Sequence, residues 1–220
     1  MIDFEHARKQ MVDTQLRPGN ITDRRVLAVM GAVAREKFVP AGRRDLAYID
    51  DIHALTAGSP PRYLPAPAPF GKLLQLAAIK ATDSILDVGC ASGYSTAVLA
   101  GLGAAVVGVE NEPELVAQAI GNLAATGIGN ATILQAPPEA GAEARGPFDV
   151  IVVEGTVDAV PEALLAQLQD HGRLVALIRA GATAVAHLYV RAGKDVAARS
   201  AFNASLPPLA VAKRPQEFVF

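Results

Sequence analysis

The sequence predicts a doubly wound α/β fold: a mostly parallel sheet covered by helices, with antiparallel strands at its C-terminal end and a helical extension at its N-terminus. From residue 84 to residue 178, short runs rich in Val, Leu, Ile and Ala alternate with segments of helical periodicity. That alternation is typical of parallel strands joined by right-handed helical crossovers. After residue 178, strand-like runs follow one another without helices between them, which favours antiparallel pairing.

The individual elements follow from the apolar pattern and from the positions of Gly and Pro. Apolar residues recur at helical spacing through the first 50 residues, and a further helix is expected over 70–81. Beyond it we expect strands at 85–88, 105–109, 131–134, 148–153, 173–178, 185–191, 196–203 and 217–220, and helices at 94–100, 112–125 and 161–168.

The chain is expected to form a single domain of residues 1–220 with three parts. A helical extension (1–55) precedes a loop (56–69) with five prolines in fourteen residues, and an α/β core (70–220) follows. So many prolines rule out a regular helix in the loop and remove several backbone donors. The stretch is either a linker or an ordered loop beside a binding site, and we favour the ordered loop because a predicted helix follows at once.

The composition argues against several functions. The chain has 220 residues, 51% of them hydrophobic, a single cysteine and a net charge of −2. A near-neutral charge without basic runs argues against a nucleic-acid partner, and one cysteine excludes an internal disulfide and a multi-cysteine metal site. With no long apolar run and no signal-peptide pattern, we expect a cytoplasmic protein without a membrane partner and without a metal. Nothing in the sequence specifies an oligomeric state.

The stretch that carries chemistry follows the first predicted parallel strand. Asp87 lies at the end of that strand, and small residues from Gly89 to Gly93 form a tight turn into a helix. Small residues let a ligand approach the backbone at the carboxyl edge of the sheet. The next strand ends in Glu110, whose carboxylate is placed to accept hydrogen bonds from both hydroxyls of a ribose.

This turn favours a cationic nucleoside over a dinucleotide. The Gly89-x-Ala91-x-Gly93 spacing is one residue too short for the dinucleotide fingerprint, which disfavours a nicotinamide-dependent oxidoreductase. Asp87 would repel a pyrophosphate but suits the ammonium of a methionine moiety. We therefore expect S-adenosyl-L-methionine as cofactor. The candidate cofactor-binding residues are Asp87, Gly89, Cys90, Ala91, Gly93, Tyr94, Ser95, Glu110 and Asn111.

Three of these residues have alternative interpretations. Cys90 is either a thiol near the ligand or, more simply, a small packing residue. Tyr94 is expected to pack the turn, and Ser95 to cap the helix that follows.

The chain resembles the protein-L-isoaspartate O-methyltransferase family along most of its length. The motifs that carry the resemblance are Met11-Val12-x-x-Gln15-Leu16, Val26-Leu27-x-x-Met30, Arg35-Glu36-x-Phe38-Val39-Pro40, Ala47-Tyr48, the run from Asp87 to Ala100, Pro147 to Ile151, Pro161, Gln167-Leu168 and Gly172 to Val175. The resemblance implies a seven-stranded Rossmann-like methyltransferase sheet. It also implies carboxyl O-methylation of L-isoaspartyl residues in damaged proteins, a protein-repair reaction with an isoaspartyl protein or peptide as partner.

The chain departs from the family pattern at several positions. Pro65 stands where the family has an active-site serine, so the hydroxyl is missing and Arg62 or Tyr63 would have to compensate. Gln135 to Pro138 supply no carboxylate for the adenine, and Ala91 replaces a glycine.

Glu154, at the end of a strand, is the last unusual feature. As an ionised carboxylate it would repel an anionic acceptor but could act as a base toward a hydroxyl or an amine. We take Arg62, Tyr63 and Glu154 as catalytic candidates. The alternatives are a methyltransferase of the same descent with another acceptor, such as a small molecule, and a cofactor-binding protein without isoaspartyl activity.

Overall fold

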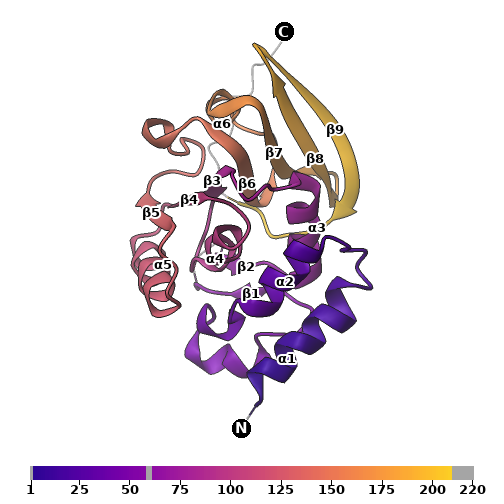
Figure 1. The fold of residues 1–220 in the computed structure, drawn as a ribbon, viewed down its shortest axis with the longest axis vertical. Coiled ribbons are helices and arrows are strands. Elements are labelled where there is room, and N and C mark those ends of the chain that lie inside the picture. The colour runs from indigo at the N-terminus through magenta and orange to yellow at the C-terminus, as the bar shows by residue number, and fades with distance from the viewer. Residues whose placement is uncertain (1, 58–60, 210–220) are drawn as a thin grey trace.

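The computed structural model describes residues 2–57 and 61–209. Within them, one sheet has the strand order β5-β4-β3-β6-β7-β8-β9 (Figure 1). Its strands are β3 (Ser84–Val88), β4 (Ala105–Glu110), β5 (Ala131–Gln135), β6 (Phe148–Val157), β7 (Leu168–Ala180), β8 (Thr183–Ala192) and β9 (Asp195–Ala204). The β5-β4-β3-β6-β7 part is parallel, whereas β7-β8 and β8-β9 pair antiparallel. The predicted fold class is confirmed.

Alternate residues along the strands enter two separate cores. One core contains Ile85, Val150 and Val152 with the helices α3, α4 and α5 on that face. The other contains Leu86 and Ile151 with α6. This alternation is the two-residue period of a strand buried on both faces. The helices are α1 (Phe4–Met11), α2 (Arg24–Ala32), α3 (Pro67–Ala77), α4 (Tyr94–Ala100), α5 (Pro113–Ala125) and α6 (Glu162–Ala166).

The N-terminal extension packs beneath the core, next to α3 and α4 (Figure 1). Besides α1 and α2 it contains a π-helical turn (Val12–Leu16), two 3-10 turns (Arg35–Lys37 and Ala41–Leu46) and the strand β1 (His53–Ala54), which pairs with β2 (Tyr63–Leu64). A third 3-10 turn spans Glu143–Arg145.

The buried Arg35 anchors the proline-rich loop to this extension. Its Nη2 donates to the Pro65 carbonyl at 2.6 Å and its Nε to the Ala47 carbonyl at 2.7 Å. Its guanidinium also lies over the Tyr94 ring, 4.8 Å from the centroid. The loop is therefore tied to the helical extension on one side and to the start of α4 on the other.

Several predicted boundaries were wrong. The helix expected at 70–81 begins at Pro67 and ends at Ala77, because prolines are tolerated in a first helical turn and Ala78 adopts a left-handed conformation. The helix expected at 161–168 is shorter, because β7 already begins at Leu168. The strand expected at 217–220 lies outside the described residues. In the described part of the chain, no helix has the length and apolar character needed to cross a membrane.

Candidate active site

The turn after β3 has the backbone conformation that small residues permit. Gly89, Ala91 and Gly93 all have positive φ, at 82°, 49° and 88°. The amides of Gly89 and Cys90 both donate to the Val109 carbonyl, at 2.8 and 3.1 Å. This pins the turn to the end of β4 and brings the carboxyl ends of β3 and β4 together. Ala91 carries mild strain there, since a left-handed conformation costs an L-residue roughly 1–2 kcal/mol.

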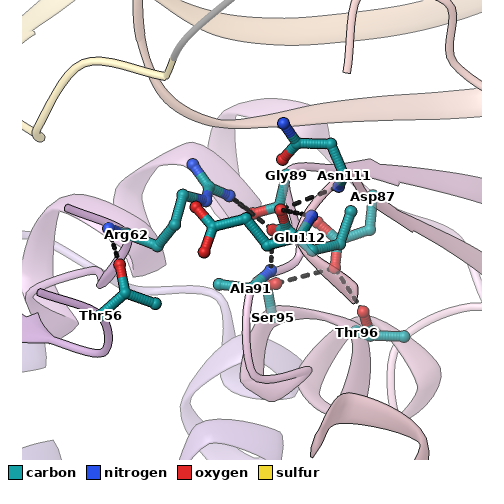
Figure 2. Close-up of polar contacts among 10 residues, drawn as sticks. Thr56, Arg62, Asp87, Gly89, Ala91, Ser95, Thr96, Asn111 and Glu112 are labelled. Carbon is teal, nitrogen blue, oxygen red and sulfur yellow. Dashed lines mark hydrogen bonds and ion pairs between the residues drawn. The ribbon is translucent and has the colours of Figure 1, made fainter. Parts of the chain in front are cut away.

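Asp87 lies fully buried at the end of β3. Its Oδ2 accepts hydrogen bonds from Ser95 Oγ at 2.7 Å and Thr96 Oγ1 at 2.6 Å (Figure 2). Its Oδ1 is buried without a partner. Burial raises the pKa of Asp87 to about 6, although the two hydroxyl hydrogen bonds pull the pKa down. The free oxygen is the kind of group that a cationic donor would satisfy.

Glu110 lies at the end of β4, and its carboxylate is fully satisfied by the chain itself. Oε2 accepts from Arg62 Nη2 at 2.7 Å and from the Ala91 amide at 2.9 Å. Oε1 accepts from the amides of Asn111 and Glu112, at 2.9 and 3.2 Å. A carboxylate has about four lone-pair sites, so a ribose can bind Glu110 only by displacing one of these donors.

Arg62 reaches from the proline-rich loop across the cofactor turn, as Figure 2 shows. Its Nη2 donates both to Glu110 and to the Gly89 carbonyl, the latter at 2.9 Å. The Arg62 amide in turn donates to Thr56 Oγ1 at 3.0 Å. Arg62 is the one side chain among the four donors to Glu110, and it comes from a loop. It is therefore the donor that a ligand can displace most easily.

Glu154 lies in a β-bulge of β6, where the pairing with β7 shifts between Val152 and Thr156. The next residue, Gly155, has φ 149°, and a Cβ there would approach Leu209 Cβ to 2.9 Å. Both carboxyl oxygens of Glu154 are buried without a hydrogen-bond partner. Burial raises the pKa of Glu154 well above its usual range; the Asp87 carboxylate raises it further, and Arg62 lowers it.

A cavity of about 20 Å³ lies beside the cofactor turn, and we call it the acceptor cavity. It is lined by Pro61, Arg62, Tyr63, Pro65, Glu154, Gly155, Leu206, Pro207 and Pro208. A groove of about 400 Å³ shares Leu206, Pro207 and Pro208 with it and includes Asp50 and Asp51. The small cavity thus adjoins a larger surface groove.

All three catalytic candidates from the sequence, Arg62, Tyr63 and Glu154, line the acceptor cavity together with Pro65. The residues predicted for the cofactor divide into two groups. The backbone of Gly89 to Gly93 and the carboxylates of Asp87 and Glu110 gather at one edge of the sheet.

The side chains of Cys90 and Tyr94 lie instead in the core. Tyr94 packs against Phe38 and Phe70, with ring centroids 5.7 and 5.9 Å away. Burial raises the pKa of the Cys90 thiol far above its ordinary value, as expected for a packing residue. The backbone amide of Asn111 donates to Glu110, whereas the Asn111 side chain is exposed.

The predicted cap at Ser95 was wrong. The cap position of α4 is Gly93, without a side-chain cap, and the Ser95 hydroxyl donates to Asp87.

Sequence reasoning also missed residues that shape the site. Thr96 supplies the second hydroxyl to Asp87, and its position one residue after Ser95 at the start of the helix was an available signal. Leu209 is different: a Cβ at Gly89 would come within 2.8 Å of Leu209 Cδ1. The segment that carries it is held by Thr156, whose amide donates to the Pro207 carbonyl at 3.0 Å while its carbonyl accepts from the Leu209 amide at 2.9 Å. No local pattern predicts this contact.

The parallel sheet and the turn at its carboxyl edge define the class of α/β proteins that bind a nucleoside-containing ligand at that edge. A family profile described as Protein-L-isoaspartate(D-aspartate) O-methyltransferase (PCMT) matches residues 6–208. The chain is 40% identical over 171 residues to Protein-L-isoaspartate O-methyltransferase 2 of Anaeromyxobacter sp. (strain Fw109-5), covering 78% of this chain and 69% of that protein. The chain therefore belongs to the PCMT family.

Two solved structures agree in fold. A protein-L-isoaspartate O-methyltransferase superposes with TM-score 0.81 and 20% identity over 92% of this chain and 66% of its own, so this chain spans about two thirds of that protein. A Plasmodium falciparum protein assigned to the same family, in complex with S-adenosyl-L-homocysteine, superposes with TM-score 0.78 and 22% identity over 96% of this chain and 99% of its own. At such identities the likeness establishes the fold alone.

Proposed function

We propose that this chain is an S-adenosyl-L-methionine-dependent carboxyl O-methyltransferase that acts on L-isoaspartyl residues of proteins. The observation that carries the proposal is the pair of buried carboxylates at the ends of β3 and β4, joined to the acceptor cavity by Arg62, which binds Glu110 and lines the cavity. Membership of the PCMT family supports the same reaction.

The residues fit the cofactor by their chemistry. Asp87 keeps one buried oxygen without a partner, which suits the ammonium of a methionine moiety. Glu110 would hold the ribose hydroxyls, with Arg62 giving up its place on the carboxylate. Gly89 would allow the ligand to approach the backbone once the Leu209 and Arg62 side chains, which now pack against it, have moved aside. When bound, the cofactor supplies a methyl group on a positively charged sulfur.

The acceptor half of the site would hold a carboxylate. Arg62 lines the acceptor cavity, and once released from Glu110 its guanidinium can bind an acceptor carboxylate in the bidentate way that arginine favours. A carboxylate is already ionised at neutral pH, so the reaction needs no general base. One acceptor oxygen forms a bond to the methyl carbon while the carbon–sulfur bond breaks and its electron pair stays on sulfur. The protein contributes orientation and exclusion of water.

One observation favours a second candidate, a methyltransferase of the same descent with a different acceptor. Pro65 lines the acceptor cavity, so the hydroxyl that family members carry there is missing. A hydrogen bond to a charged group contributes roughly 1.5–3 kcal/mol. Its loss would weaken isoaspartyl binding unless another donor replaced it, and a small-molecule acceptor is the alternative.

The test is methyl transfer to a matched peptide pair. The protein is incubated with methyl-labelled S-adenosyl-L-methionine and an isoaspartyl peptide, with the normal aspartyl peptide as control. We expect base-labile label on the isoaspartyl peptide alone. If no label is transferred although calorimetry detects S-adenosyl-L-homocysteine binding, the isoaspartyl assignment is wrong and the acceptor is another compound. If no binding is detected either, the cofactor assignment fails as well.

A further inference from the structure

Glu154 is a buried acidic side chain that the proposed reaction does not yet use. Neither of its carboxyl oxygens has a hydrogen-bond partner, and both are shielded from solvent. An ionised carboxylate in such a place would lack both hydration and hydrogen bonds, which is far more costly than burying a neutral acid. The bulge in β6 and the close packing of Gly155 against Leu209 hold the side chain at the cavity wall.

The charged and titratable groups around Glu154 come from three segments. Asp87 lies on the neighbouring strand β3, Arg62 lies on the proline-rich loop, and Tyr63 begins β2. The fourth neighbour is the segment Leu206 to Pro208, which carries no titratable side chain. Arg62 is the cation in this set, and its Nη2 is already bound to Glu110 and Gly89. No hydrogen bond or ion pair between Arg62 and Glu154 is formed among the described residues.

We propose that Glu154 stays protonated at neutral pH and donates a hydrogen bond to one oxygen of the acceptor carboxylate, in place of the hydroxyl that Pro65 lacks. This inference rests on the proposed function. The proton remains on Glu154, so no proton is transferred, and the second acceptor oxygen is left free to form the bond to the methyl carbon. Glu154 and Pro65 line the same cavity, so a donor at Glu154 can reach a ligand that a hydroxyl at position 65 would also reach.

The same arrangement excludes the role of a general base for Glu154. A carboxyl group that already holds its proton cannot accept one from a hydroxyl or an amine. Burial and the nearby Asp87 both raise the pKa of Glu154. Binding of an anionic acceptor would raise the pKa further, whereas a cationic cofactor would lower it. The acceptor therefore strengthens the hold of Glu154 on its proton, and the cofactor offsets part of that effect.

The first test measures the protonation state directly and needs no turnover. The protein is labelled with ¹³C at glutamate carboxyl carbons, and the Glu154 resonance is identified as the one missing from the Glu154→Gln variant. We expect that resonance at the position of a neutral acid at pH 7, titrating only above neutrality, with and without S-adenosyl-L-homocysteine. A Glu154 that is ionised at pH 7 in both forms would overturn the inference.

The second test uses the pH dependence of methyl transfer to the isoaspartyl peptide. In the wild-type protein, kcat/KM should fall as pH rises through the raised pKa of Glu154. Glu154→Gln keeps an N–H donor, so its activity at pH 7 should stay within about threefold of wild type while the alkaline loss disappears. Glu154→Ala should raise KM roughly tenfold or more, with a smaller change in kcat. Glu143→Gln, at an exposed carboxylate in the Glu143–Arg145 turn, is the matched control and should behave as wild type.

The outcomes separate this inference from the proposed function. If wild type transfers label and Glu154→Gln loses at least a hundredfold at pH 7, Glu154 is a base and the inference is wrong. If both proteins transfer label with the same pH profile, Glu154 is merely structural and the inference is again wrong. If wild type transfers no label to the peptide, the proposed function fails, and the carboxyl resonance still decides the protonation state.

Discussion

The two halves of the site differ in how well their acidic groups are satisfied. In the cofactor half, Glu110 accepts hydrogen bonds from four donors, and Asp87 accepts two on one of its oxygens. In the acceptor half, Glu154 accepts none. All three carboxyl groups are buried at the carboxyl edge of the same parallel sheet. They therefore differ in the hydrogen-bond donors around them and not in how deeply they are buried.

The difference indicates that the cofactor half stabilises an ionised carboxylate, Glu110, whereas the acceptor half holds Glu154 as a neutral acid. Backbone amides from the turn and from the start of α5 fix the charge of Glu110 in place. The carboxylate of Glu110 in the cofactor half thus already has its full set of donors, of which Arg62 must move to admit a ribose. In the acceptor half, Glu154 has no hydrogen-bond partner, and the Arg62 guanidinium that lines the same cavity is bound to Glu110.

The largest effect is expected from Glu110→Ala. It removes the ion-pair partner of Arg62, which keeps only the Gly89 carbonyl, and it removes the acceptor of three backbone amides. Breaking a buried ion pair from one side typically costs about 3–5 kcal/mol. We expect a loss of this size in the free energy of unfolding, measured by urea denaturation, and no calorimetric binding of S-adenosyl-L-homocysteine. Glu114→Ala, exposed on α5, is the control. Unchanged stability would mean that the two halves do not differ as described.

Asp87→Asn tests the one unsatisfied oxygen in the cofactor half. Because the pKa of Asp87 is raised to about 6 in the folded protein, the folded state binds the proton more tightly than the unfolded state. The free energy of unfolding of wild type should therefore fall as pH rises from about 4 to about 6, by up to about 3 kcal/mol. Asp87→Asn should lack this fall and be the more stable protein at pH 7.5, while binding S-adenosyl-L-homocysteine more weakly. Parallel pH profiles of the two proteins would contradict this account of Asp87.

Pro65→Ser tests whether the acceptor half lacks a donor. The Pro65 carbonyl that binds Arg35 is retained, and the new hydroxyl faces the acceptor cavity. Since Glu154 already donates in our account, we expect only a small gain in wild type but a recovery of about fivefold or more in the Glu154→Ala background, measured as kcat/KM on the isoaspartyl peptide. Pro69→Ser, in the first turn of α3, should bring no recovery. Equal effects of the two substitutions would rule out a specific donor at position 65.

The smallest effect is expected from Ala91→Gly in the cofactor turn. Ala91 has φ 49°, and glycine removes this strain at the cost of a more flexible unfolded chain. The net gain in the free energy of unfolding should be up to about 1 kcal/mol. Ala97→Gly, inside α4 and buried, should instead be destabilising, so the two variants are distinguished by the sign of the change.

The sequence predicted most of the fold, and it placed the cofactor-binding candidates at the ends of adjacent strands, because strands and turns are encoded locally. Asp87 and Glu110 each end a strand of clear apolar pattern, and the small residues between Gly89 and Gly93 mark the turn. Contacts between distant segments could not be predicted. Arg62 binds Glu110 across 48 positions, and Leu209 packs on Gly89 from the far end of the chain. The bulge that places Glu154 depends on its register with β7, which no local pattern shows.

The central claim, that the acceptor is a carboxylate, is tested most directly by locating the transferred methyl group. An isoaspartyl peptide that also contains lysine, serine and a normal aspartate is incubated with S-adenosyl-L-methionine and the protein, and is then fragmented in a mass spectrometer. We expect a single methyl ester on the side carboxylate of the isoaspartyl residue. Methyl groups on the lysine amine or the serine hydroxyl, or an unmodified peptide although S-adenosyl-L-homocysteine binds, would contradict it.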